Sequence, residues 1–153
     1  MILTAIKIEL AEPSLPDELE AYFRLRWLLL RAPWGRPLGS ERDEFEESAH
    51  HLIARVPSGE LVGVGRIHFP DTDTAQIRYI ATTEQFRRQG IGQAIVKRLE
   101  QVAEARGALM VALNAREVAV SFFEGLDYSV CGDGHTLFGA IRHKKMEKPL
   151  SVG

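Results

Sequence analysis

The sequence predicts an α+β fold around one mostly antiparallel sheet, in a single domain of residues 1–153. Two observations indicate this class. In the first half, segments in which apolar and polar residues alternate are joined by short turns such as Pro57-Ser58-Gly59-Glu60, which is typical of antiparallel hairpins. In the second half, strand patterns and helix patterns take turns along the chain.

The first half is predicted to contain two helices among four strands. Ser14 is expected to cap a helix that runs to about Leu30, because acidic residues occupy its first turn. Ser40 is expected to cap a short acidic helix that ends at Ala49. The strands are expected, in order, at Thr4–Leu10, His51–Val56, Leu61–Phe69 and Thr74–Thr82.

An amphipathic helix opens the second half. Ile91, Ile95 and Leu99 recur on one helical face, and Gly107 is typical of a C-cap. The remaining elements are expected as a strand at Leu109–Asn114, a helix at Arg116–Leu126, and a final strand pair at Tyr128–Cys131 and Leu137–Met146.

The loop Arg87-Arg88-Gln89-Gly90-Ile91-Gly92 joins a predicted strand to this helix. The first amides of a helix lack internal partners and lie at the positive end of its dipole, so glycines and arginines beside them favour phosphate. A P-loop is excluded because Gly-Lys-Ser/Thr is absent. A dinucleotide fold is disfavoured because Ile95 stands where a third small residue is required.

Composition excludes several classes of function. The formal net charge of −2 gives no reason to expect nucleic acid as a partner. No apolar run approaches the roughly 18–20 residues of a membrane span, so no membrane partner is expected. The single cysteine, Cys131, fits a reducing compartment, and no leader pattern opens the chain, so we expect a cytoplasmic protein.

The loop resembles the pyrophosphate-binding motif of the GNAT superfamily of acyl-CoA-dependent N-acetyltransferases. The stretch Ala119–Tyr128 is similar to the second signature of that family: Ala, two variable residues, Phe-Tyr, two more, then Leu-Gly-Phe. Three segments, residues 26–31, 39–43 and 49–51, are similar to the acetyltransferase domain that some bacterial proteins carry fused to a hot-dog thioesterase domain. The resemblance implies about seven strands flanked by about four helices, with two splayed parallel strands forming an acyl-CoA cleft.

By resemblance, the co-substrate is acetyl-CoA, and its acetyl group passes directly to an amine of a small molecule or peptide. The residues implied in binding it are Ile80, Ala81 and Thr82 for the pantetheine arm; Arg87, Arg88, Gln89, Gly90, Ile91, Gly92 and Gln93 for the pyrophosphate; and Asn114, Ala119, Phe122 and Phe123 near the thioester. The resemblance also allows a homodimer, because family members often dimerise through terminal strands, but the sequence does not fix the oligomeric state.

The catalytic positions depart from the family pattern. Phe123 replaces a Tyr that would protonate the thiolate, and Gln76 replaces a frequent basic Glu. The candidate catalytic residues that remain are Glu117, Asn114, Tyr128 and His143, with His50 and His51 as further candidate bases. The two adjacent histidines should face opposite sides of a strand, and neither has ligands at metal-binding spacing, so no zinc site is expected.

The acidic stretch Glu41–Glu47 has two interpretations. Its carboxylates could attract a cationic amine, or they could form an exposed helix face, which we favour. Two other functions stay open as well. One is decarboxylation of a malonyl thioester on the same fold, which needs no amine base. The other is a non-catalytic acyl-CoA-binding module.

Overall fold

The computed structural model describes residues 7–150, which form two compact units. The first unit contains the described residues up to His68 together with Tyr79–Leu99. The second contains Phe69–Arg78 and the described residues from Glu100 onwards. The prediction of a single domain stays a prediction.

The strands follow the hydrogen-bonded order β1-β2-β3-β4-β5-β7-β6. They are β1 (Glu9–Ala11), β2 (His50–Arg55), β3 (Leu61–His68), β4 (Thr74–Thr82), β5 (Met110–Arg116), β6 (Ser129–Leu137) and β7 (Ile141–Pro149). The pair β4–β5 is parallel, whereas β1–β2, β2–β3, β5–β7 and β6–β7 are antiparallel. The predicted mixed, mostly antiparallel sheet is confirmed.

The helices are fewer than predicted. Residues 7–150 contain α1 (Pro16–Leu30), α2 (Ile91–Ala105) and α3 (Val120–Glu124), with 3₁₀ turns η1 (Ala32–Trp34), η2 (Glu84–Phe86) and η3 (Glu117–Ala119). The expected acidic helix is absent there: residues 41–49 form turns, because Asp43 accepts the Phe45 amide at 2.9 Å and so offers the backbone an alternative to helix.

Other boundaries also differ from the predictions. The cap of α1 is Leu15 rather than Ser14, because Pro16 suits the first helical position and Glu18 accepts the Leu15 amide at 3.3 Å. The first strand is shorter and later than expected, and residues 4–6 of that prediction lie outside the described residues. The helix expected at Arg116–Leu126 divides into η3 and the five-residue α3.

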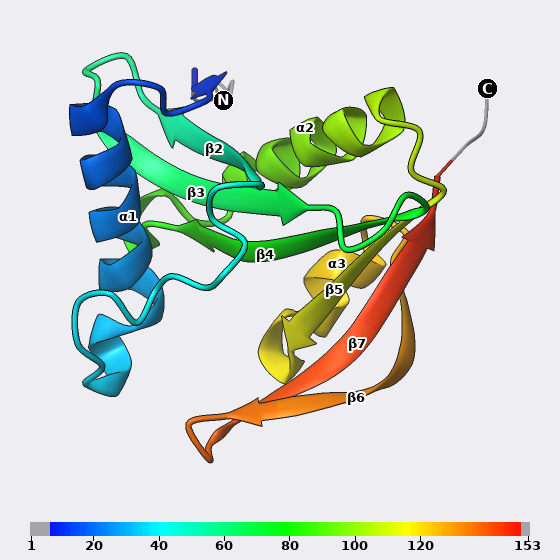
Figure 1. The fold of residues 1–153 in the computed structure, drawn as a ribbon. Coiled ribbons are helices and arrows are strands. Elements are labelled where there is room, and N and C mark those ends of the chain that lie inside the picture. Colours follow the sequence, from blue (N-terminus) through cyan, green and yellow to red (C-terminus); the bar gives the residue numbers. More distant parts are fainter. Residues whose placement is uncertain (1–6, 151–153) are drawn as a thin grey trace, which may run out of the picture. The chain divides into compact units, whose positions relative to one another are not determined.

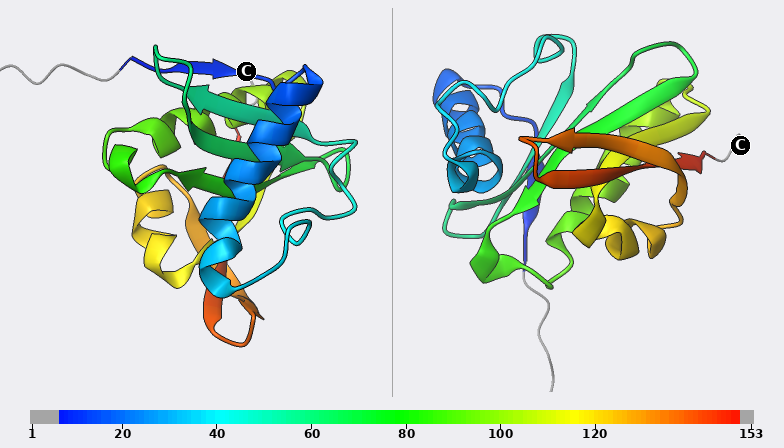
Figure 2. Two further views of the ribbon diagram at one scale, coloured as in Figure 1. Left: turned by 90° about the vertical axis from the view of Figure 1, so that its left-hand side faces the viewer. Right: turned by 90° about the horizontal axis from the view of Figure 1, so that it is seen from below.

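In the first unit, α1 and the start of α2 cover opposite faces of β3 (Figures 1 and 2). On the α1 side, Val64 packs with Tyr22 and Ile53. On the α2 side, a Cβ at Gly65 would lie only 2.5 Å from Ile95 Cγ2, closer than real Cβ contacts. The missing side chain therefore lets α2 lie against the strand.

In the second unit, the strand register fixes which side chains share a face. The parallel register of β4 and β5 runs from Thr74–Met110 to Ile77–Leu113. In the antiparallel β5–β7 pair, Asn114 lies opposite Lys145 and Arg116 opposite His143. Because neighbours in register share a face, these four side chains form one polar face of the unit. Leu113, Ala115 and Met146 are buried on the other face.

Candidate functional site

The loop between β4 and α2 presents its polar residues to solvent. Arg87, Arg88, Gln89 and Gly90 are all exposed. Arg88 and Gly90 adopt left-handed backbone, with φ of 63° and 83°, which turns the chain sharply into the helix. The Arg87 Nε donates a 3.2 Å hydrogen bond to the Thr82 carbonyl, which ties the loop to the end of β4.

The first turn of α2 leaves three amides for a ligand. Ala94 donates to the Gly90 carbonyl at 3.0 Å, so the Ile91, Gly92 and Gln93 amides precede the first helical hydrogen bond. A Cβ at Gly90 would meet nothing within 4 Å, so the approach to these amides is open at that residue. Free amides, a helix dipole and two exposed arginines suit an anion such as pyrophosphate.

At the end of β4, the side chains of Ile80 and Ala81 pack against neighbouring residues of the first unit. The Ile80 side chain points toward Gly65, since a Cβ there would lie 2.9 Å from Ile80 Cδ1. Ala81 packs against the Tyr22 cluster. What Ile80 and Ala81 can offer a ligand is therefore their backbone.

The residues expected near the thioester belong to the second unit. Asn114 is exposed and directly follows Leu113, the last β5 residue in the parallel register. Ala119 ends η3 and is half-buried. Phe122 is 40% exposed, whereas Phe123 is buried and meets the Phe122 ring edge-on at 4.9 Å. Phe122 is thus the more available aromatic side chain.

His143 is buried and lies on the same polar face as Asn114. Its Nδ1 is 3.0 Å from the Ile141 carbonyl and 3.1 Å from the His135 carbonyl. The two imidazole rings of His135 and His143 stack at 4.4 Å. Burial, and secondly the charge of His135, lower the pKa of His143.

The Tyr128 hydroxyl is engaged in a buried hydrogen bond. It donates a 2.7 Å hydrogen bond to Glu100, which also binds Lys148 Nζ at 3.2 Å. Burial and this carboxylate raise the pKa of Tyr128. The Tyr128 proton is therefore held by a buried structural group.

Glu117 is exposed at the start of η3. Its charge contributes, after that of Asp133, to the raised pKa of Lys144, which lies on the β7 face opposite to His143. His51 and His50 do point to different partners, as predicted: His51 contacts Tyr22, and His50 lies 2.9 Å from Glu12.

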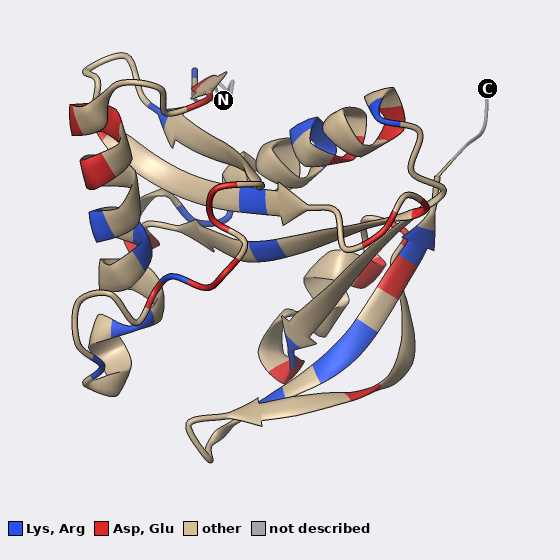
Figure 3. Ribbon diagram, viewed as in Figure 1, with Lys and Arg blue, Asp and Glu red and all other residues tan. Residues whose placement is uncertain are grey.

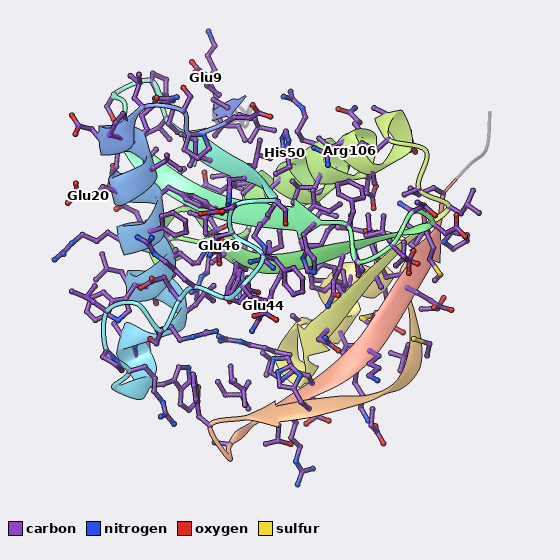
Figure 4. The ribbon with its side chains drawn as sticks, viewed as in Figure 1. Glu9, Glu20, Glu44, Glu46, His50 and Arg106 are labelled. Carbon is purple, nitrogen blue, oxygen red and sulfur yellow. The ribbon has the colours of Figure 1, made fainter. Side chains whose placement is uncertain are left out.

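A buried charged network in the first unit was not predicted from the sequence. Arg66 of β3 binds Asp43 at 2.6 and 2.9 Å and Glu46 at 3.0 Å. Arg26 of α1 binds Glu46 at 2.9 Å and the Glu41 carbonyl at 3.0 Å. Figure 3 shows the acidic segments of the α1–β2 loop beside a basic segment of β3, and Figure 4 labels Glu46 on this loop.

This network continues through Tyr22 and His51. The Arg26 guanidinium donates to the Tyr22 hydroxyl, which lies 2.7 Å from His51 Nδ1. His51 Nε2 donates to the Glu46 carbonyl at 2.7 Å, so Nδ1 is the acceptor. The Tyr79 ring lies 4.1 Å from the Arg26 guanidinium carbon and 5.0 Å from that of Arg66.

The sequence carried one signal for the network. Arg26 follows Tyr22 by four residues, so the two share a helical face, and α1 buries this pair instead of an apolar stripe. The acidic stretch then supplies the opposite charges. Our preferred interpretation of that stretch as an exposed helix face is wrong, since Glu41 is buried and Asp43 and Glu46 turn inward.

Residues 7–150 offer neither a metal site nor a membrane-spanning helix. Within that range, no group of three or more His, Cys, Asp or Glu side chains is placed to hold a metal ion. No helix in the same range is both long and apolar enough to cross a membrane.

The family model described as the acetyltransferase (GNAT) family matches residues 19–128. The chain belongs to this family. An acetyltransferase of Pectobacterium atrosepticum is 33% identical over 118 residues, which cover 73% of this chain and 82% of that protein. The predictions of an acyltransferase enzyme and of the GNAT fold are confirmed.

Solved structures of GNAT enzymes share this fold. An acyl-CoA N-acyltransferase from Pseudomonas aeruginosa has a TM-score of 0.77 at 21% identity, over 94% of this chain and 99% of that one. An aminoglycoside 6'-N-acetyltransferase complexed with coenzyme A has a TM-score of 0.75 at 17% identity, over 94% of this chain and 97% of that one. At these identities the likeness concerns the fold alone.

Proposed function

We propose that this GNAT protein transfers an acetyl group from acetyl-CoA directly to an amine of a small molecule or peptide. The observation that carries the proposal is the β4–α2 loop. Its exposed Arg87 and Arg88 lead into the free amides of Ile91, Gly92 and Gln93, which suits the pyrophosphate of coenzyme A. Coenzyme A is the ligand held by the structurally similar aminoglycoside enzyme.

The residues proposed to bind acetyl-CoA are those that the family pattern indicates. The backbone of Ile80, Ala81 and Thr82 would pair with the pantetheine arm, and Arg87 through Gln93 would hold the pyrophosphate. Asn114, Ala119, Phe122 and Phe123 would lie near the thioester. Glu117, Asn114, Tyr128 and His143 remain the candidate catalytic residues. A cytoplasmic location, a homodimer and the likeness to domains fused to thioesterases stay predictions.

Calorimetric titration of acetyl-CoA into the wild type, Gly92→Glu and Gly92→Ala tests the binding site. Both substitutions replace a helical glycine and should favour the helix by up to about 1 kcal/mol. Only Gly92→Glu places a negative charge at the proposed pyrophosphate. We expect binding by the wild type and Gly92→Ala and loss of binding by Gly92→Glu. Equal binding by all three would reject the loop as the pyrophosphate site.

Turnover is tested with a panel of amines: an aminoglycoside, a polyamine and a peptide with a free N-terminal amine. Release of the free thiol and the mass of the acetylated amine are measured together. Acetylation of any amine supports the proposal. Conversion of malonyl-CoA to acetyl-CoA without an amine would replace it with decarboxylation, and binding without turnover would replace it with a non-catalytic module.

A further inference from the structure

The polar face of the second unit holds His143 in one defined tautomer. Both groups within reach of its Nδ1 are backbone carbonyls, of Ile141 at 3.0 Å and of His135 at 3.1 Å. Carbonyl oxygens only accept hydrogen bonds, so Nδ1 must carry the proton. The neutral ring then has its lone pair at Nε2, which makes no hydrogen bond to any residue between 7 and 150.

The surroundings of His143 favour this neutral form. The ring is buried and stacks on His135 of β6. Arg116 lies opposite it on β5, and Lys145 follows two residues later on the same face of β7. These three neighbours, His135, Arg116 and Lys145, are bases or cations and would repel an added proton, whereas the carboxylate on this face of β7, Glu147, is four residues away from His143. Burial, His135 and Arg116 accordingly lower the pKa of His143.

Gly134 brings β6 close to both His143 and Asn114. A Cβ on Gly134 would lie 3.0 Å from His143 Cβ and 3.2 Å from Asn114 Oδ1. Both distances are shorter than about nine in ten real Cβ contacts, so a larger residue would displace these groups by a few tenths of an ångström. The Asn114 amide and His143 therefore flank the same point on the polar face, and the glycine permits this arrangement.

We propose that His143 Nε2 is the base that accepts the proton of the acceptor amine, beside a thioester positioned at Asn114. This assignment rests on the proposed function. The amine nitrogen forms a bond to the acetyl carbonyl carbon, and the carbon–sulfur bond breaks with its electron pair on sulfur. The amine proton passes to Nε2, and the imidazolium then releases a proton to the thiolate. The products are the N-acetylated amine, free coenzyme A and neutral His143.

The other candidate groups are less suited to this role. The Tyr128 hydroxyl is bound to Glu100 and lies against the buried side of the unit. Glu117 is exposed at the start of η3, whereas His143 is buried. His143 combines burial, a defined tautomer and a place beside Gly134 that it shares with Asn114.

The test variant is His143→Asn. An Asn side chain places an N–H donor near the position of Nδ1, so the bonds to the two carbonyls can persist while Nε2 is lost. We expect kcat for the best amine of the panel to fall at least about 100-fold. The calorimetric affinity for acetyl-CoA should not change. His135→Gln serves as the control, because it alters the stacked neighbour and leaves Nε2 in place.

The pH profile of kcat separates a catalytic from a structural role. The wild type should gain activity as pH rises through the lowered pKa of His143, below its ordinary value of about 6.5. His135→Gln should shift this limb to higher pH, and His143→Asn should abolish it. A His143→Asn enzyme with wild-type kcat and an unchanged profile would overturn the inference while leaving the acetyltransferase proposal intact. Absence of acetyl transfer by the wild type would instead defeat both.

A second measurement needs no acceptor. Nitrogen-15 NMR of the imidazole rings reports which nitrogen is protonated in the folded protein. A His143 ring protonated at Nδ1 at pH 7 is expected. A ring protonated at Nε2 would have no lone pair at the proposed position and would overturn the assignment.

Discussion

Arg66 and Asp43 form a two-pronged ion pair, with Nη1 2.6 Å from Oδ1 and Nη2 2.9 Å from Oδ2. The Arg66 side chain is fully buried, and Glu46 also binds it at 3.0 Å. This geometry joins β3 to a segment of turns, residues 41–49, that has no regular secondary structure. The pair therefore helps to anchor that segment through side chains, together with Arg26.

Replacing Arg66 with Met should destabilise the protein by about 3–5 kcal/mol, because two inward carboxylates lose their common partner. Urea unfolding of the variant and the wild type measures the difference. Lys144→Met is the control: Lys144 pairs with Asp133 at 2.5 Å, but that carboxylate is 86% exposed, and the change should be much smaller. Equal destabilisation by the two variants would contradict the prediction.

His51 should make stability depend on pH. Burial lowers its pKa, and the folded protein uses the neutral ring to accept from Tyr22 and to donate to Glu46. A lowered pKa in the folded state means that the unfolded chain binds more protons between the two pKa values. The contribution is present above the unfolded pKa of about 6.5 and is lost as pH falls below it.

Thermal or urea unfolding between pH 7.5 and about pH 5 measures this dependence. His51→Gln should be less stable at pH 7.5 and should lose stability less steeply toward acid. His143 shares the same direction of shift, so His143→Asn should reduce the remaining slope. A wild-type stability that rises toward pH 5 would show that the sign is wrong.

Gly65→Ala should destabilise the protein by about 1–3 kcal/mol through overpacking. The new methyl group would lie 2.5 Å from Ile95 Cγ2 and 2.9 Å from Ile80 Cδ1. Gly132→Ala is a matched control on a strand, since a Cβ there would meet nothing within 4 Å. Because Ile95 is itself fully buried, Ile95→Ala is destabilising alone, but the losses from Ile95→Ala and Gly65→Ala should be less than additive when combined. Full additivity would contradict a steric cause.

Tyr128→Phe separates structure from catalysis at that residue. Removing the hydroxyl leaves Glu100, which is 8% exposed, with Lys148 alone and should cost about 1–3 kcal/mol. We expect a lower unfolding temperature with kcat maintained at temperatures well below it. A large fall in kcat with unchanged stability would indicate that Tyr128 protonates the thiolate after all.

Much of the fold followed from local patterns in the sequence. β4 spans the predicted Thr74–Thr82, and the amphipathic α2 begins directly after the Gly90 loop and ends at Ala105, two residues before Gly107. These elements have strong periodicity and clear terminal residues. The loop that carries the proposed function could be located for the same reason, because its arginines and glycines are adjacent in the chain.

The buried network could not be predicted in this way. Arg26, Asp43 and Arg66 are far apart in sequence, and each alone is typical of an exposed position. The acidic stretch has the composition of a helix, but its Asp43 and Glu46 carboxylates bind Arg66 and Arg26 instead of facing solvent. The placement of His143 and Asn114 on one face likewise depends on the register of β5, β6 and β7, which residue patterns do not fix.

The α1–β2 loop owes its shape to residues outside itself, since Arg26 and Arg66 hold it through Asp43, Glu46 and the Glu41 carbonyl. The loop sequence alone would consequently not keep this conformation in another protein. A homologous loop grafted between Ser40 and His50 would bring its own sequence but would fold as here only if it offered carboxylates at the same two positions. Conversely, Arg26 and Arg66 could hold loops that differ at their other positions, without any change to the sheet.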